Sequence, residues 1–278
     1  MGDIVAVFAT SHAPGMTGIP HLADEKQREN VYAAFGRLKE RLEAARPDAL
    51  VCISNDHLTN FFLNNMPSLC IGVADSYFGP PPEFERLVGV QPRLFPGHAE
   101  LGRAILREAL ASGFDPSFSG ELIIDDNFAG PLHLLMPEKT IPLVLIIVNA
   151  VEPPMPSLMR CYQFGATLRR AIHNQTVAER VAILATGGIS HWVGTPEMGR
   201  INIDFDHKIL DLVAQGKGEE IARLSDDEVA AAGNGAFEIR NWLVALGAVP
   251  GTKFDVLAYE PVYPWITGIG VTAAQLPG

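Results

Sequence analysis

Cysteine is scarce in this chain of 278 residues, which has only Cys52, Cys70 and Cys161. None of them forms a C-x-x-C pair, and an odd number of widely spaced thiols is a poor framework for disulfides. Cys52 and Cys70 lie in apolar segments, which indicates buried thiols kept reduced. The cysteine pattern therefore predicts a cytoplasmic protein.

Positive charge is also in short supply, because 21 Lys and Arg residues face 32 Asp and Glu residues, for a net charge of −11. An acidic surface repels phosphate backbones and anionic lipid, which argues against nucleic-acid and membrane partners. The longest apolar run, 141–148, contains Pro142 and is too short to span a bilayer. The N-terminus lacks the basic region and cleavage site of a signal peptide.

Hydrophobic residues are plentiful, at 47% of the chain, and charged residues make up 19%. This is the composition of a globular protein with a sizeable core. The length suits one large domain, so we expect a single catalytic domain over residues 1–278.

Apolar runs and helical periodicity alternate along most of the chain. Strands are predicted at 4–9, 49–54, 66–73, 141–148 and 181–185, and helices at 24–46, 98–112, 157–172, 201–213, 218–224 and 236–246. The proline-rich residues 76–96 show no period and are predicted to be a long loop, and the tail from Phe254 is predicted to form an edge strand. This alternation predicts a layered α/β fold with a mostly parallel or mixed central sheet and helices on both faces.

Three predicted strands end at a histidine. The first leads into Ser11-His12, the second into Asn55-Asp56-His57, and the strand at 181–185 into Thr186-Gly187-Gly188-Ile189-Ser190-His191. Ligands gather outside the carboxyl ends of strands in open α/β sheets. A lone histidine at such a place is usually structural, but three at equivalent places predict a site.

Two imidazoles and one carboxylate with open positions suit a non-haem Fe(II) site that activates oxygen. Zinc can use the same ligands in a hydrolase. Glu238 lies in an amphipathic helix beside Phe237, Ile239 and Trp242, but these patterns alone do not select it over Asp56 or Asp125.

The sequence resembles the class III extradiol ring-cleavage dioxygenases, a family typified by the catalytic β subunit of protocatechuate 4,5-dioxygenase. The segments that carry the resemblance span most of the chain in this order: ATSHAPG, ISNDH, GHAELGRAIL, VNAVEPPMPSLMRCYQFG, ATGGISH, RINIDFD and FEIRNWLVALGAVP. The resemblance implies a single α/β domain. It also implies that His12, His57 and Glu238 bind Fe(II) and that His191 is the catalytic acid and base.

One position departs from the family pattern. The family usually carries Asp-His-Gly where this chain has Asp125-Asp126-Asn127. An imidazole can donate a hydrogen bond, whereas an ionised carboxylate can only accept one. We therefore expect Asp126 to accept from a substrate N–H, as in an aminophenol or a hydroxypyridone, in place of a simple catechol acid. In the alternative, Asp126 points away.

Four further residues have two interpretations each. Asp56 and Asn55 either orient His57 or a nearby loop, or form a turn. Gly188 lets the backbone approach the substrate closely, or forms a plain tight turn. Tyr259 lines the pocket or packs in the core.

The predicted partners are O2 and a small aromatic or heteroaromatic molecule, with either a homo-oligomer or a separate small subunit. Two rival functions are a zinc-dependent hydrolase with the same ligands and a non-catalytic subunit of a dioxygenase complex. Dependence on O2 distinguishes the first rival. The presence of His12, His57, Glu238 and His191 together argues against the second.

Overall fold

The computed structural model describes residues 1–138 and 140–277. Its central sheet has eight strands in the order β6-β3-β7-β2-β8-β1-β10-β9. Strands β7, β2, β8 and β1 run parallel, whereas β3–β7, β1–β10 and β10–β9 pair antiparallel. The predicted mixed sheet is therefore confirmed, with β9 at its edge. The strands are β1 (Asp3–Thr10), β2 (Ala49–Ser54), β3 (Leu69–Gly72), β6 (Ser117–Ser119), β7 (Leu143–Val148), β8 (Arg180–Thr186), β9 (Phe254–Val262) and β10 (Thr267–Ala274).

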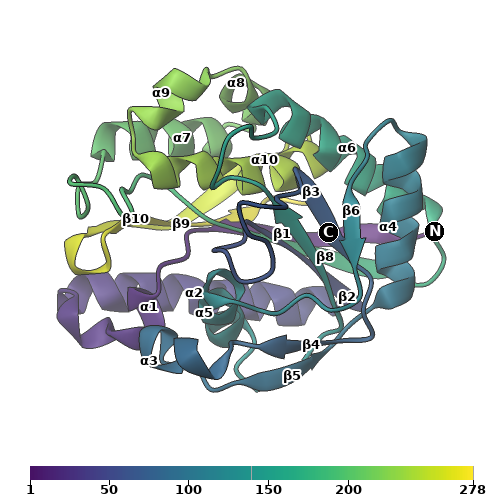
Figure 1. Ribbon diagram of the computed structural model, residues 1–278, viewed down its shortest axis with the longest axis horizontal. Helices are drawn as coiled ribbons and strands as arrows, with labels where there is room; N and C mark the ends of the chain where they lie inside the picture. The colour runs from purple at the N-terminus through teal and green to yellow at the C-terminus, as the bar shows by residue number, and fades with distance from the viewer. Residues whose placement is uncertain (139, 278) are drawn as a thin grey trace.

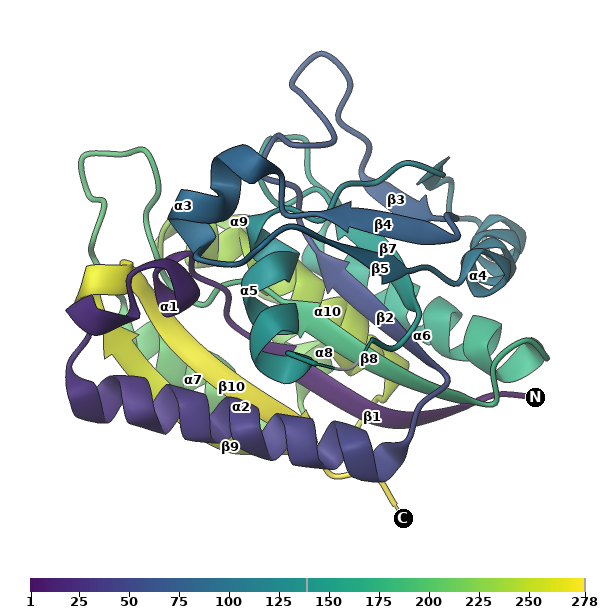
Figure 2. The ribbon, with the colours of Figure 1, turned by 90° about the horizontal axis from the view of Figure 1, so that it is seen from below.

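Helices cover both faces of the sheet, as Figures 1 and 2 show. One face packs against α4 (Ala99–Ala111), α6 (Leu158–Asn174), α7 (Ile203–Ala214) and α10 (Ile239–Ala248), and the other against α2 (Glu25–Ala45) and α5 (Asp126–Leu135). Each layer buries its own apolar cluster. The shorter elements are α1 (Gly15–Gly18), α3 (Glu85–Val88), α8 (Gly218–Ala222), α9 (Asp226–Ala230), η1 (Pro20–Leu22), η2 (Pro82–Phe84), η3 (Asn234–Glu238) and η4 (Tyr263–Trp265).

Helix α2 forms as its sequence predicts. Asp24 caps its start by accepting hydrogen bonds from the backbone N–H groups of Lys26 and Gln27, which satisfies donors that have no partner within the helix. Its buried stripe lies against the sheet and includes Val31, Ala34, Leu38 and Leu42.

The predicted loop at 76–96 is wrong in part. Strands β4 (Ser76–Gly79) and β5 (Arg93–Pro96) form a separate antiparallel pair. Each strand has only four residues, which is too short for alternation to stand out among the prolines. Pairing across the hairpin, where Tyr77 opposes Phe95, stabilises what the local pattern does not reveal.

Helix α5 was not predicted either. It contains Pro131, and its residues from Asp126 to Leu132 are all buried. A stretch of helix that is buried all round shows no amphipathic period, because its residues do not alternate between an apolar and an exposed face. Its N-terminus lies at the carboxyl edge of the sheet, where Asp125 caps it.

Trp242 of α10 joins two of the strands that end at a histidine. Its fully buried indole N–H lies 3.1 Å from the Thr10 carbonyl oxygen and 3.0 Å from that of Gly187. These bonds hold the end of β1, the segment after β8 and α10 in one arrangement.

We predict that Trp242→Phe lowers the free energy of unfolding by about 1–3 kcal/mol, because the carbonyl oxygens lose a buried donor. Urea denaturation measures the change. Trp192→Phe, at a half-buried indole, is the matched control and should stay within about 0.5 kcal/mol of the parent. Equal losses in the two variants would contradict this role of Trp242.

Candidate metal centre and active site

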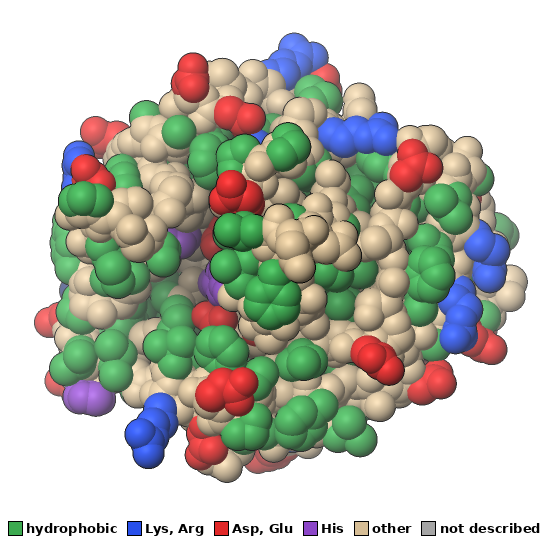
Figure 3. Space-filling view, in the orientation of Figure 1, with side chains coloured by type: hydrophobic (Ala, Val, Ile, Leu, Met, Phe, Trp, Pro, Cys, Tyr) green, Lys and Arg blue, Asp and Glu red, His purple; other side chains and the backbone are tan. Residues whose placement is uncertain are grey.

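The three histidines predicted at strand ends lie at one edge of the sheet, because β1, β2 and β8 run parallel. The His12 and His57 rings meet edge to face, with centroids 5.2 Å apart. Glu238 reaches them from the last residue of η3, directly before α10. The helix predicted over 236–246 therefore begins with a tighter turn, and Glu238 lies at its junction with α10. Figure 3 shows a hollow in the surface with histidine and acidic side chains inside it.

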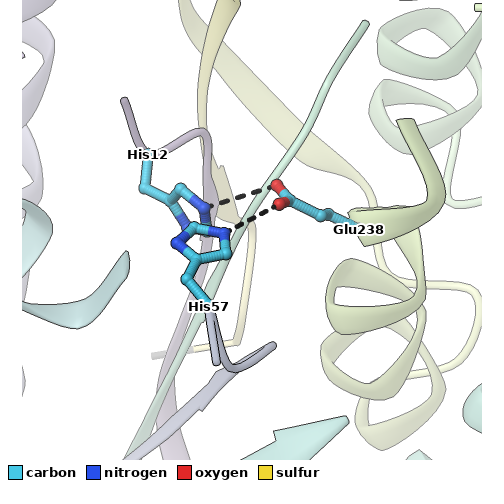
Figure 4. A group of neighbouring side chains, drawn as sticks. All are labelled: His12, His57 and Glu238. Carbon is cyan, nitrogen blue, oxygen red and sulfur yellow. Dashed lines mark hydrogen bonds and ion pairs between the residues drawn. The ribbon is translucent and has the colours of Figure 1, made fainter. Parts of the chain in front are cut away.

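Both imidazoles direct Nε2 at the Glu238 carboxylate, as Figure 4 shows. His12 Nε2 lies 3.4 Å from Oε2, and His57 Nε2 lies 3.3 Å from Oε1. One ligand atom from each of the three side chains fits within a span of 4.8 Å. His12 Nε2 is buried and has no hydrogen-bond partner, as expected for a nitrogen that binds a metal. The donor set therefore fits a divalent cation.

The Nδ1 contacts set the tautomer of each imidazole. Thr186 Oγ1 lies 3.2 Å from His12 Nδ1 and 3.1 Å from the Asn127 carbonyl oxygen, to which it can only donate. It therefore accepts from His12 Nδ1. His57 Nδ1 donates to Asp126 Oδ1 over 3.0 Å. In the neutral form that binds a metal, both rings would thus keep their proton on Nδ1 and present the lone pair of Nε2.

Charge within the cluster favours an ionised Glu238. Burial raises the pKa of this carboxyl, but His12, His191 and His57 outweigh burial and hold the pKa well below its usual range. Burial lowers the pKa of His57, but Asp126 and Glu238 outweigh it, and the net pKa lies well above the usual value. In the absence of a cation, the two carboxylates thus attract positive charge to this place.

Backbone and side-chain donors fix the Glu238 carboxylate. The Gly188 N–H donates to Oε2 over 2.7 Å, and Asn55 Nδ2 donates to Oε1 over 3.1 Å. Asn55 Oδ1 accepts in turn from Asn241 Nδ2 over 3.0 Å. Asn55 thus contacts Glu238, whereas the sequence suggested that Asn55 orients His57 or a nearby loop. Gly188 adopts a positive φ of 59°, a conformation that favours glycine.

Asp56 holds the loop that follows His57. Its carboxylate accepts from the backbone N–H groups of Thr59, Asn60 and Phe61 at 2.9–3.1 Å. Asp56 therefore caps the turn that follows His57, and an influence of Asp56 on the orientation of His57 stays a prediction.

His191 lies beside the cluster, with Nε2 3.9 Å from Glu238 Oε2. Its Nδ1 lies 3.3 Å from the Ile189 carbonyl oxygen, which can only accept, so Nδ1 carries the proton and Nε2 has a free lone pair. The ring is buried, and burial lowers its pKa below the usual value. A Cβ at Gly235 would lie 2.1 Å from Nε2, so only glycine leaves room for this ring.

Asp126 contacts an imidazole of the cluster, whereas Tyr259 contacts residues outside the cluster. Asp126 is buried against His57 Nδ1, so at least one of its oxygens is already used, and its contact with a substrate stays a prediction. Tyr259 is half-buried, and its hydroxyl donates to Asp206 over 2.7 Å while its ring contacts His207. Pocket lining by Tyr259 stays a prediction.

The sequence reasoning missed two polar residues of the site. Thr186 contacts His12, and Asp206 contacts Ser190 next to His191. Thr186 ends β8 and Asp206 lies in the RINIDFD segment, so both were within recognised motifs without an assigned role.

Within residues 1–138 and 140–277, no helix is long and apolar enough to cross a membrane.

Comparison with known proteins identifies the family of this chain. Residues 6–271 match the model of the family described as the catalytic LigB subunit of aromatic ring-opening dioxygenase. In Escherichia coli strains K12 and O157:H7 EC4115, the 2,3-dihydroxyphenylpropionate/2,3-dihydroxicinnamic acid 1,2-dioxygenase is 26% identical to this chain. That alignment covers 95% of this chain and 96% of the relative.

A solved structure shares the fold. The crystal structure of uncharacterized protein JW3007 from E. coli K12 superposes with a TM-score of 0.61 at 13% identity, and covers 96% of this chain and 99% of that one. The family match spans nearly the whole chain and includes every strand end that carries a histidine. The chain therefore belongs to the family of catalytic LigB subunits of aromatic ring-opening dioxygenases and is a ring-cleaving oxidoreductase.

Proposed function

We propose that this protein is an extradiol dioxygenase that uses Fe(II) to open the ring of a catechol-like, aminophenol or hydroxypyridone substrate with O2. The observation that carries the proposal is the convergence of His12 Nε2, His57 Nε2 and the ionised Glu238 carboxylate, with the free Nε2 of His191 beside them. Two imidazoles and a carboxylate with open positions are the ligand set of oxygen-activating ferrous sites. The name of the E. coli relative, a dioxygenase of a 2,3-dihydroxyphenyl acid, supports a ring with two adjacent hydroxyls.

His12, His57 and Glu238 would hold a ferrous ion, which would supply electron transfer between the electron-rich ring and O2. The residues of this chain supply the other requirements. Glu238 stays ionised and is held by Gly188 and Asn55, so it keeps one orientation through the reaction. The Nδ1 contacts of His12 and His57 hold their rings.

His191 supplies proton transfer. Its Nε2 lone pair accepts the proton of a ring hydroxyl as the substrate binds, while Nδ1–H stays bonded to the Ile189 carbonyl. The same nitrogen returns that proton later in the cycle, when the oxygen–oxygen bond breaks. The lowered pKa of His191 keeps it neutral, and hence basic, before the substrate arrives.

The experiment that tests this function compares two metals. The protein is loaded anaerobically with Fe(II) or Zn(II) and mixed with catechols, aminophenols and hydroxypyridones before O2 is admitted. We expect oxygen uptake and ring-opened product only with Fe(II). Product formation with Zn(II) in the absence of O2 would contradict the proposal and favour a hydrolase.

We predict that Asp126→His changes the preference among these substrates. The Asp126 carboxylate can accept from an aminophenol N–H, whereas an imidazole can also donate to a hydroxyl. The ratio of kcat/KM for 2-aminophenol to that for catechol should fall by at least about tenfold. The matched control is Asp115→His at an exposed position. An unchanged ratio in an iron-loaded Asp126→His protein would remove this role.

The other expectations from the sequence extend beyond the site. A homo-oligomer or a small separate subunit, a cytoplasmic location and a single catalytic domain over residues 1–278 stay predictions. Gel filtration with light scattering measures the first of these directly.

A further inference from the structure

We infer that the buried carboxylate of Asp206 is a positioning residue for His191. It holds the segment from Ile189 to His191 so that the imidazole keeps its proton on Nδ1 and directs Nε2 at Glu238. This inference rests on the proposed function only for the role of His191 in turnover. The geometry itself does not depend on the reaction.

Asp206 lies in the first turn of α7 and has no exposed surface. Its Oδ1 accepts from the Ser190 N–H over 2.8 Å, and its Oδ2 accepts from the Ser190 hydroxyl over 2.9 Å. The Tyr259 hydroxyl also donates to Oδ2, over 2.7 Å. Burial raises the pKa of Asp206, whereas these donors and His207 lower it, and the net pKa is about 6. The group is therefore ionised at neutral pH and can accept from all three donors.

Two further hydrogen bonds add to the anchor at Ser190. Its hydroxyl oxygen accepts from the Asn202 N–H over 2.7 Å, and its carbonyl accepts from the Gly268 N–H over 3.2 Å. A Cβ at Gly268 would lie 2.0 Å from Asp206 Oδ2, so β10 packs directly against the carboxylate. Asp206 thus connects α7, β9 and β10 to the residue directly before His191.

The His191 ring depends on this backbone. The acceptor of its Nδ1 proton is the Ile189 carbonyl, two residues earlier and on the other side of Ser190. The Gly235 N–H donates to the His191 carbonyl over 3.1 Å. The ring therefore lies between an anchor at Ser190 and an anchor at Gly235. Loss of the Asp206 bonds would remove two of the four hydrogen bonds that hold Ser190 and loosen the position of the Ile189 carbonyl against Nδ1.

The first test is independent of enzyme activity. Long-range 1H–15N correlation spectra of the Zn(II)-loaded protein report the tautomer of each histidine, and the His191 signals are assigned by their loss in His191→Ala. We expect the Nδ1–H tautomer in the parent and a mixture of tautomers in Asp206→Asn, because an amide offers these three donors one acceptor oxygen. The matched control is Asp211→Asn, at an exposed position of α7. An unchanged tautomer in a folded Asp206→Asn protein would overturn the inference.

The second test is a double-mutant cycle in the Fe(II) enzyme. We expect Asp206→Asn to lower kcat by about ten- to a hundredfold, with iron content unchanged and KM within about twofold, as for a group that acts through a general base. In a His191→Ala background it should lower kcat no further. An equal loss of kcat in both backgrounds would overturn the inference.

Tyr259→Phe serves if Asp206→Asn does not fold, because it removes one donor to Asp206 and keeps the ring. It should lower kcat by about threefold in the parent and not in the His191→Ala background. A loss of similar size in both backgrounds would overturn the inference. If the tautomer changes as expected but no substrate consumes O2, the proposed function fails and the positioning role of Asp206 stands.

Discussion

Glu238→Gln is expected to lower the affinity for Fe(II) by more than about 100-fold, because it removes the only anionic ligand of the proposed set. Loss of a group that merely orients a metal ligand has a smaller effect on affinity. Gln has nearly the same shape, and its single amide oxygen can still accept from Gly188 or from Asn55, so the fold should be kept. The measurement is anaerobic titration with Fe(II), followed by gel filtration and metal analysis. His12→Ala and His57→Ala should lose iron in the same way.

The control for this loss is Glu121→Gln, which removes the same charge at an exposed position. It should bind one Fe(II) per chain with the affinity of the parent. If Glu238→Gln keeps iron as tightly as Glu121→Gln does, the carboxylate is no ligand and the proposed site is wrong.

His191→Ala should have a different effect, with turnover lost and iron kept. Its Nε2 lies 3.9 Å from Glu238 Oε2 and offers a free lone pair beside the three proposed ligands. We expect kcat to fall by about a hundred- to ten-thousandfold, as is typical of a general acid–base residue. Stopped-flow absorbance after rapid mixing with O2 measures this rate, and His173→Ala, at an exposed histidine, is the control.

The pH profile gives an independent signature of His191. Burial lowers its pKa, so the neutral, basic form persists to more acidic pH than for an ordinary histidine. A base acts only when unprotonated, so kcat/KM should fall with decreasing pH at a value below about 6.5. This acidic limb should be missing in His191→Ala. A variant that loses its iron with its activity, or keeps the limb, would contradict the assigned role.

The strand ends could be predicted from the sequence because their signals are local. Each of β1, β2 and β8 is a short apolar run followed at once by polar residues and a histidine, and parallel pairing brings such ends to one edge. Glu238 could not be chosen in this way, because its neighbours have the ordinary pattern of a buried helix. Its selection depended on the family resemblance, and the structure places it within reach of both imidazoles.

The partners of the site residues could not be predicted, because they are far apart in the sequence. Asn55 and Glu238 are separated by 183 positions, and Tyr259 and Asp206 by 53. No periodicity or motif specifies which amide contacts which carboxylate. The hairpin of β4 and β5 and the buried helix α5 were missed for a related reason. Pairing and burial stabilise them, and neither leaves a period in the sequence.

The most direct test of the iron-dependent ring opening is isotope incorporation. The Fe(II)-loaded protein is given 18O2 and whichever substrate consumes oxygen fastest, and the product is trapped quickly and examined by mass spectrometry. We predict one O2 consumed per ring opened, two labelled oxygen atoms in the product, and no product from Glu238→Gln. A ring-opened product that takes its oxygen from water, or the same labelled product from iron-free Glu238→Gln, would contradict it.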